Sequence, residues 1–216
     1  MRRTPMLEST QRTTAAEPLW AAERDPAPGY WHLLDPMVLA EAAPIQAAGH
    51  YHPRIEAGIG YVLAYTLPSV SCTAADVLAA TDYIVPSLEL VDSRILDRRT
   101  GLAGTVAGNA SPAAVILGDV RRTPAELAAR GIDLADIEVV LYAGHEEIAR
   151  GNTGAALVNP TARIARLATK MADFGVRLEA GHLILPGSCT QAIDARPGTA
   201  FRAEFAGLGI VTALFE

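Results

Sequence analysis

Two glutamates stand in apolar surroundings, and their carboxyl groups are the first candidates for chemistry. Glu56 comes shortly before the apolar run 59–63, and Glu89 lies inside the stretch 84–92, which reads IVPSLELVD. A carboxylate among apolar residues is costly unless it is paired, hydrogen-bonded or bound to a metal ion. Strand alternation places Glu89 on one face with Ser87 and Val91. Two alternatives stay open: an edge strand on which Glu89 faces water, or a Glu89 that points into a pocket.

Two carboxylates from different strands have two chemical uses. They could hold a hard divalent cation such as Mg²⁺, or they could divide the roles of acid and base. A further acid, Asp92, is followed two positions later by Arg94. Arg94 could neutralise Asp92 or bind a substrate carboxylate with its forked guanidinium, and the structural ion pair is the more common outcome.

Two polar loops could present hydroxyl and amide groups to a substrate. The loop 108–112 (GNASP) carries Asn109 and Ser111, and the loop 186–190 (PGSCT) carries Ser188. Each loop could bind an anion, and each is equally compatible with an ordinary turn. Ser188 lacks the G-x-S-x-G context of a nucleophilic serine, which argues against a serine hydrolase.

Histidines supply the remaining candidates. His50 and His52 are two residues apart, a spacing that would suit a metal pair on a strand, and His182 directly precedes a strand-like run. A single histidine is more often at the surface or in a structural hydrogen bond than catalytic. These three residues are therefore weaker candidates than the two glutamates.

Composition limits the function classes. The chain has 216 residues, of which 50% are hydrophobic, a formal net charge of -6 and two cysteines. The high hydrophobic content predicts a folded core. The acidic net charge argues against nucleic-acid binding. Two cysteines are too few for a cysteine-only zinc site. We find no apolar run long enough to span a membrane and no signal peptide. A cytoplasmic protein that acts on a small molecule, without nucleic-acid or membrane partners, is expected.

The elements that must position these groups are mostly strands. Strand-like runs occupy residues 58–65, 84–91, 113–117, 137–142, 183–185, 200–205 and 210–215. Helices are expected at 73–80, at 123–130 and at 159–175, with Thr73, Thr123 and Asn159 as N-caps. A hairpin is expected to turn at Gly144. This pattern predicts an α+β, β-rich domain over residues 28–216, preceded by an N-terminal arm at 1–27.

Several segments together resemble a known family. PRIEAGIGYVL at 53–63, followed by LELVDSRI at 88–95, is similar to the 2-keto-4-pentenoate hydratase / 4-oxalocrotonate decarboxylase family of the fumarylacetoacetate hydrolase superfamily. GNAS at 108–111, GAA at 154–156 with the following Asn159-Pro160, and AGHLILPGS at 180–188 resemble its D-N-A-S, G-A-A-x-x-x-P and A-G-D-x-I-L-S-G-S segments. The resemblance implies a rolled mixed β-sheet with a few flanking helices. It also implies a Mg²⁺ or Mn²⁺ site of three glutamates, and chemistry on 2-oxo or 2-hydroxydienoate acids.

The sequence departs from this family at the residues that do its chemistry. Only Glu56 and Glu89 match the three metal-binding glutamates. Glycine or histidine stands at four positions where the family has an acidic residue: Gly29, Gly58, Gly108 and His182. The family's upstream K-x-G-L-T-S segment with its catalytic lysine has no counterpart, so the arm at 1–27 is shortened relative to the family. Losing one of three carboxylates weakens a Mg²⁺ site severely. Without a metal, two neighbouring buried carboxylates repel, which raises the pKa of one of them and creates an acid/base pair.

These departures favour a repurposed enzyme of the lyase or isomerase type. We expect a metal-independent cyclase, isomerase or lyase that acts on a bulky enolisable or polyene substrate in secondary metabolism, in a pocket enlarged by the glycines. One alternative is a Mg²⁺-dependent hydratase or decarboxylase of 2-oxo acids, and another is a non-catalytic subunit of such an enzyme. The metal-independent enzyme is expected to have no cofactor, whereas the hydratase or decarboxylase alternative would bind Mg²⁺ or Mn²⁺. The chain is expected to form a homo-oligomer. The predicted catalytic residues are Glu56, Glu89 and His182; the predicted substrate-binding residues are Arg54, Asn109, Ser111 and Ser188; Glu56 and Glu89 would also hold the metal.

Overall fold

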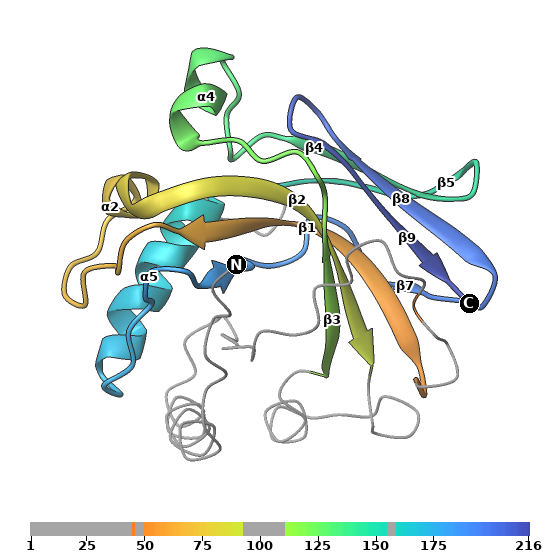
Figure 1. Cartoon of the computed structure of the whole chain (residues 1–216), viewed down its shortest axis with the longest axis horizontal. Coiled ribbons are helices and arrows are strands. Elements are labelled where there is room, and N and C mark those ends of the chain that lie inside the picture. Colours follow the sequence, from red (N-terminus) through yellow and green to blue (C-terminus); the bar gives the residue numbers. More distant parts are fainter. Residues whose placement is uncertain (1–44, 46–49, 93–110, 155–158) are drawn as a thin grey trace, which may run out of the picture.

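Two antiparallel sheets form the body of the protein (Figure 1). A computed structural model describes residue 45 and residues 50–92, 111–154 and 159–216. Within these ranges, a five-stranded sheet has the order β3-β2-β1-β6, with β7 also paired to β1. Its strands are β1 (Pro53–Leu63), β2 (Thr81–Asp92), β3 (Pro112–Leu117), β6 (Leu183–Ile184) and β7 (Ile193–Asp194). The four-stranded sheet has the order β5-β4-β8-β9, and its strands are β4 (Glu138–Ala143), β5 (Glu146–Asn152), β8 (Thr199–Phe205) and β9 (Gly209–Phe215).

The long pair β1–β2 divides the molecule into an apolar side and a polar side. Alternate residues of β1 are fully buried and apolar: Ile55, Ala57, Ile59, Tyr61 and Leu63. The residues of the other face are Arg54, Glu56, Gly58, Gly60 and Val62. Because side chains alternate along a strand, one face of β1 enters the core and the other carries Glu56. On β2 the same alternation buries Ile84, Leu88 and Leu90 in the core.

Three helices flank the sheets at the places that the sequence predicts. They are α2 (Ala74–Ala80), α4 (Pro124–Ala129) and α5 (Pro160–Ala172). Capping boxes at Thr73 and Thr123 start α2 and α4, and the Asn159 side chain caps α5. α5 buries Ile164, Leu167 and Met171, at the spacing of one helical face, and lies beside β1 (Figure 1). The buried hydroxyl groups of Tyr61 and Thr161, 3.0 Å apart, tie α5 to the core face of β1.

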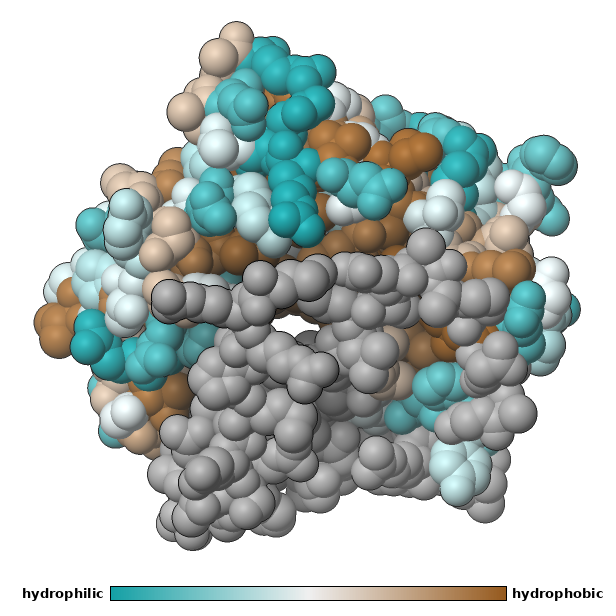
Figure 2. Space-filling model, in the orientation of Figure 1, coloured by the Kyte–Doolittle hydropathy of each residue, from teal (hydrophilic) through white to brown (hydrophobic). Residues whose placement is uncertain are grey.

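The surface around α4 differs from the surface over the sheets. Figure 2 shows hydrophilic residues mixed with weakly apolar ones around α4, and more strongly apolar atoms in a band over the sheets below it. In the part of the chain that the structure describes, no helix is long and apolar enough to cross a membrane.

The β-rich α+β fold is confirmed, with two differences in detail. The ladders between the named strands are antiparallel, and among the described residues the parallel pairing is the bridge between Ile45 and Phe215. β1 begins at Pro53 and not at 58, because its polar start pairs with the end of β2. β2 lies between β1 and β3, so the edge-strand alternative for Glu89 is wrong. The expected arm at 1–27 lies outside the described residues.

Candidate active site

The two glutamates predicted from the sequence lie directly opposite each other. Glu56 of β1 pairs with Glu89 of β2 in the antiparallel ladder. Directly opposed residues share a face of the sheet, and their Cβ atoms are about 5 Å apart. Val115 of β3 opposes Glu89 on its other side. The fold therefore places two carboxyl groups side by side on the face opposite to α5.

Burial makes both carboxyl groups hard to ionise, and charge repulsion adds to this effect at Glu89. Burial raises the pKa of Glu89 to about 7, and the charge of Glu56 adds to this effect. Burial also raises the pKa of Glu56, although the Arg54 charge and a hydrogen bond with Ser188 offset part of the increase. At neutral pH the pair is poised to share a proton or to bind a cation.

Arg54 and Ser188 lie next to Glu56, as a substrate-binding role would require. Arg54 is two residues before Glu56 on the same face of β1, and its guanidinium lies 3.4 Å from the carboxylate of Asp194 on β7. Ser188 forms an antiparallel bridge with Gly58, and its hydroxyl donates to the carbonyl of Ala57 over 3.4 Å. Both residues are half-buried, so each presents a polar group at the border of the site.

The other predicted residues are placed differently. Asn109 and Arg94 lie outside the described residues. Ser111 adopts a left-handed backbone conformation with φ of 63°, and its carbonyl accepts a hydrogen bond from the Asp92 amide over 2.8 Å. Ser111 therefore lies at the Asp92 end of β2, three positions along from Glu89.

His182 lies away from the glutamates. The Leu63 amide donates to its carbonyl, so His182 is beside the last residue of β1, seven positions from Glu56. At about 3.3 Å per residue, this corresponds to about 23 Å along the strand. Its Nδ1 accepts a hydrogen bond from the Glu179 amide over 3.1 Å. The predicted catalytic role of His182 beside Glu56 and Glu89 is not supported by this placement, because the histidine belongs to the turn before β6.

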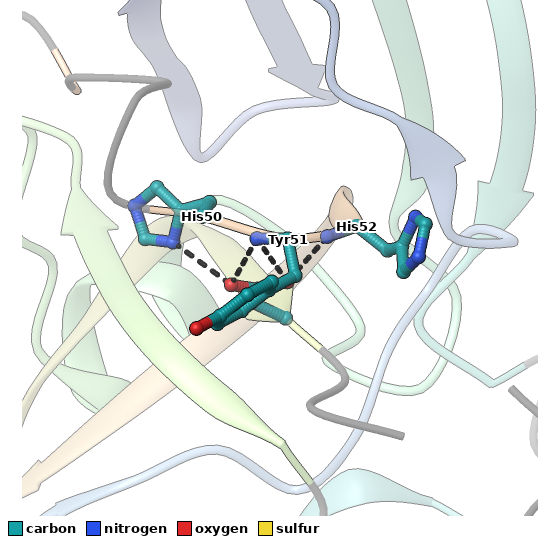
Figure 3. Close-up of polar contacts among 4 residues, drawn as sticks. His50, Tyr51 and His52 are labelled. Atoms are coloured by element: carbon teal, nitrogen blue, oxygen red, sulfur yellow. Dashed lines mark hydrogen bonds and ion pairs between the residues drawn. The ribbon is translucent and has the colours of Figure 1, made fainter. Parts of the chain in front are cut away.

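His50 and His52 do not form a metal pair. Figure 3 shows their rings on opposite sides of Tyr51. His50 Nδ1 lies 3.3 Å from the Asp92 carboxylate, which also accepts hydrogen bonds from the Tyr51 and His52 amides over 3.0 and 2.7 Å. Burial alone would raise the pKa of Asp92, but these contacts outweigh it and hold the pKa below its ordinary value. Asp92 thus anchors residues 50–52 to the end of β2.

Ser87 is a site residue whose importance the sequence did not reveal. Strand alternation places it on the face of Glu89, but only the ladder shows that Gly58 is its partner. The Ser87 side chain is 1% exposed, and its Oγ has no hydrogen-bond partner among the described residues. A buried hydroxyl without a partner needs an explanation, and a ligand or water bound beside the two carboxyl groups would supply one.

The donor set gives a partial fit to a divalent cation. Two glutamate carboxylates face each other, which suits a hard cation, and an unpaired hydroxyl lies next to them. No group of three or more histidine, cysteine, aspartate or glutamate side chains that could hold a metal ion occurs in the described ranges. Glu56 and Glu89 could therefore hold a cation only with further oxygen ligands, such as water or substrate.

Comparison with known proteins assigns the chain to a family. Residues 8–215 match the fumarylacetoacetate (FAA) hydrolase C-terminal family, and the chain belongs to it. It is 36% identical over 194 residues to the 2-oxo-hept-4-ene-1,7-dioate hydratase of Escherichia coli, which covers 87% of this chain and 71% of the relative. It is 32% identical over 188 residues to the 4-oxalocrotonate decarboxylase of Pseudomonas sp. (strain CF600), which covers 87% and 69%.

A solved structure agrees with this assignment. The 4-oxalocrotonate decarboxylase from Pseudomonas putida G7, complexed with magnesium and adipate, superposes with a TM-score of 0.73 at 32% identity. The match covers 80% of this chain but 64% of that chain, so the protein spans less than two thirds of that relative's length. These relatives are hydratases and decarboxylases, that is, enzymes of the lyase type. They agree with the interpretation of this chain as a lyase-type enzyme, and they confirm the resemblance that the sequence motifs indicated.

Proposed function

We propose that this protein is a lyase-type enzyme that adds water to, or removes carbon dioxide from, a 2-oxo or 2-hydroxydienoate acid with the help of a divalent cation. The proposal depends on the position of Glu56 directly opposite Glu89 in the β1–β2 ladder. The relatives of this chain are hydratases and decarboxylases. A related structure contains magnesium. These relatives favour the cation-dependent alternative over the metal-independent enzyme that the sequence alone suggested.

The residues of the site have distinct roles in this proposal. Glu56 and Glu89 would hold the cation, which supplies a Lewis acid for a 2-oxo group and its enolate. Arg54 provides positive charge on the same face, which attracts an anionic substrate toward Glu56. Ser188 lies beside Glu56 and lowers the pKa of its carboxyl group, which favours the ionised form that binds a cation. The apolar neighbour Val115 keeps the carboxyl groups partly away from water, which strengthens the electrostatic interactions of the site.

Turnover of 2-hydroxypenta-2,4-dienoate, followed by the loss of dienoate absorbance, tests this proposal. We expect activity with Mg²⁺ or Mn²⁺, and little after treatment with a chelator. Glu56→Gln and Glu89→Gln should each lower kcat/KM by at least a hundredfold, because each removes one of two anionic ligands. The exposed Glu179 offers a matched control, and Glu179→Gln should retain full activity.

A metal-independent acid/base enzyme is the second candidate, and the pKa of about 7 at Glu89 favours it. A protonated Glu89 could donate a proton while an ionised Glu56 accepts one, since the two carboxyl groups differ in their surroundings. A bulky enolisable or polyene substrate would suit this chemistry. Undiminished turnover of such a substrate in the presence of a chelator would favour this candidate. Strict dependence on Mg²⁺ with the dienoate would exclude it.

A further inference from the structure

The chain between β6 and β7 carries Ser188 to its place beside Glu56. Between these two strands it is attached to β1 at single points. Ser188 forms an isolated bridge with Gly58. The amide of the next residue, Cys189, donates a hydrogen bond to the Ala57 carbonyl over 2.7 Å. The position of Ser188 therefore depends on a short loop, and whatever restrains this loop also restrains the border of the candidate site.

Gly187 begins the Ser188 segment, which we define as residues 187–189. Its φ of 116° lies in the positive region, where glycine has a freedom that other residues lack. A Cβ atom placed on Gly187 would lie 2.7 and 2.8 Å from the terminal guanidinium nitrogens of Arg163, and 3.1 Å from its Cζ. The first two distances are shorter than real Cβ contacts. The Arg163 guanidinium therefore fills the space that a side chain at position 187 would take.

Arg163 reaches this segment from a turn of α5 that is itself held in place. The Thr161 amide donates to the Asn159 side chain over 2.8 Å, which caps the helix. The Thr161 hydroxyl lies 3.0 Å from the hydroxyl of Tyr61 on β1. Arg163 follows Thr161 by two residues, and the next residue, Ile164, is fully buried. Because a packed helix holds its side chains more precisely than a loop does, α5 gives Arg163 a fixed base.

The charge of Arg163 is not used in an ion pair among the described residues, whereas Arg150 and Arg202 each pair with a glutamate. The Arg163 side chain is half-buried, and burial lowers its pKa. The neighbouring Cys189 thiol does not neutralise it, because burial raises the pKa of that thiol to about 12. Arg163 thus loses hydration without gaining a carboxylate partner, and what its guanidinium does contact is the backbone at Gly187.

We propose that Arg163 is a positioning residue, which holds the Ser188 segment against β1 and so keeps Ser188 beside Glu56. The guanidinium closes the space into which the backbone at Gly187 could otherwise move. A displacement of about 1 Å near a reacting centre can cost about a hundredfold in rate, so a restraint behind the segment affects catalysis without touching the substrate. This inference rests on the proposed function, in which Glu56 holds the cation.

Amide hydrogen exchange of the full chain, followed by NMR, tests the restraint without any measurement of activity. Arg163→Met keeps a long apolar stem and removes the guanidinium. In this variant the Cys189 amide should exchange about tenfold faster than in the wild type, because its hydrogen bond to Ala57 opens more often. The Ile164 amide should keep its wild-type rate, which excludes a general loss of stability. The exposed Arg166 offers the matched control, and Arg166→Met should leave both rates unchanged.

A second substitution keeps this test decisive if Arg163→Met does not fold. Arg163→Lys retains the charge but not the planar guanidinium, so exchange of the Cys189 amide should still rise about threefold. Wild-type exchange at Cys189 in a folded Arg163 variant would overturn the positioning role, whatever the activity. Faster exchange in a protein that does not turn over the dienoate would reject the proposed function and leave the restraint of the segment in place.

Steady-state kinetics with 2-hydroxypenta-2,4-dienoate and Mg²⁺ tests whether Arg163 acts through Ser188. Arg163→Met and Ser188→Ala should each lower kcat about tenfold and change KM less than about twofold. The double variant should be within about twofold of Ser188→Ala, because both substitutions disturb the same contact. A loss of about a hundredfold in the double variant would show that the two residues act independently and would overturn the proposal. A raised KM with unchanged kcat in Arg163→Met would overturn it too, because Arg163 would then bind the substrate itself.

Discussion

The same pair of strands holds carboxyl groups in opposite states, three positions apart on β2. Asp92 accepts hydrogen bonds from two backbone amides and contacts the His50 ring, and its pKa lies below the ordinary value (Figure 3). Glu89 lies against Val115 and faces another acid, and its pKa is raised to about 7. Asp92 is buried and Glu89 is half-buried, so solvent exposure alone does not explain the difference.

The number of donors around each carboxyl group decides its state. Asp92 is surrounded by N–H groups that favour the charged form, whereas Glu89 meets a second carboxyl group. A satisfied carboxylate stabilises the fold and leaves little reactivity. An unsatisfied pair costs stability and is available to a proton, a cation or a substrate. This contrast separates the structural end of β1–β2 from its candidate chemical centre.

Removing the satisfied carboxylate should have the largest effect on stability. Asp92→Ala leaves the amides of Tyr51 and His52 without their acceptor, so we expect a loss of about 3 kcal/mol in the free energy of unfolding. Urea unfolding at pH 7 measures this loss. Asp82→Ala changes an exposed acid on the same strand and should cost less than about 0.5 kcal/mol. Equal losses in the two variants would contradict the structural role of Asp92.

Neutralising the unsatisfied carboxylate should act in the opposite direction. The folded pKa of Glu89, about 7, lies above the reference value of 4.5, so the folded state binds the proton more tightly than the unfolded state. Stability from this group is present below pH 4.5 and is lost as the pH rises through 7. In chelator, Glu89→Gln should therefore gain stability over the wild type between pH 4 and pH 8, on the order of 3 kcal/mol.

Urea unfolding across this pH range checks the effect, with Glu179→Gln as the control that should follow the wild-type curve. An added divalent cation should reduce the difference between the wild type and Glu89→Gln at pH 8, because a cation stabilises the ionised pair. A Glu89→Gln variant that is less stable than the wild type at pH 8 in chelator would show that Glu89 has a stabilising partner.

Local signals in the sequence were sufficient for the helices and for the candidate acids. The capping boxes at Thr73 and Thr123 act within four residues, and α2 and α4 begin where these boxes predict. Apolar surroundings singled out Glu89, and the structure places it half-buried on β2, between β1 and β3. These features depend on neighbours in the chain or on alternation along one strand.

Features that depend on strand register could not be predicted. The opposition of Glu56 to Glu89, and of Gly58 to Ser87, is set by how β1 pairs with β2 over eleven residues of β1. Residues 53–57 gave no strand signal of their own, because their pairing partners lie more than thirty positions away. Register also explains His182: it shares a family segment with Ser188, but the turn before β6 holds it at the far end of β1.

The smallest expected effect identifies which donors make Asp92 different from Glu89. Among the contacts that lower the pKa of Asp92, the hydrogen bonds from the His52 and Tyr51 amides outweigh those from His50. His50→Ala should therefore cost less than about 1 kcal/mol in the free energy of unfolding, since the imidazole contact is long at 3.3 Å. NMR titration of the Asp92 carboxyl should still give a pKa below the ordinary value. If His50→Ala instead lowered the free energy of unfolding as much as Asp92→Ala, the histidine would be the group that anchors residues 50–52. The difference between Asp92 and Glu89 would then depend on the His50 side chain rather than on backbone amides.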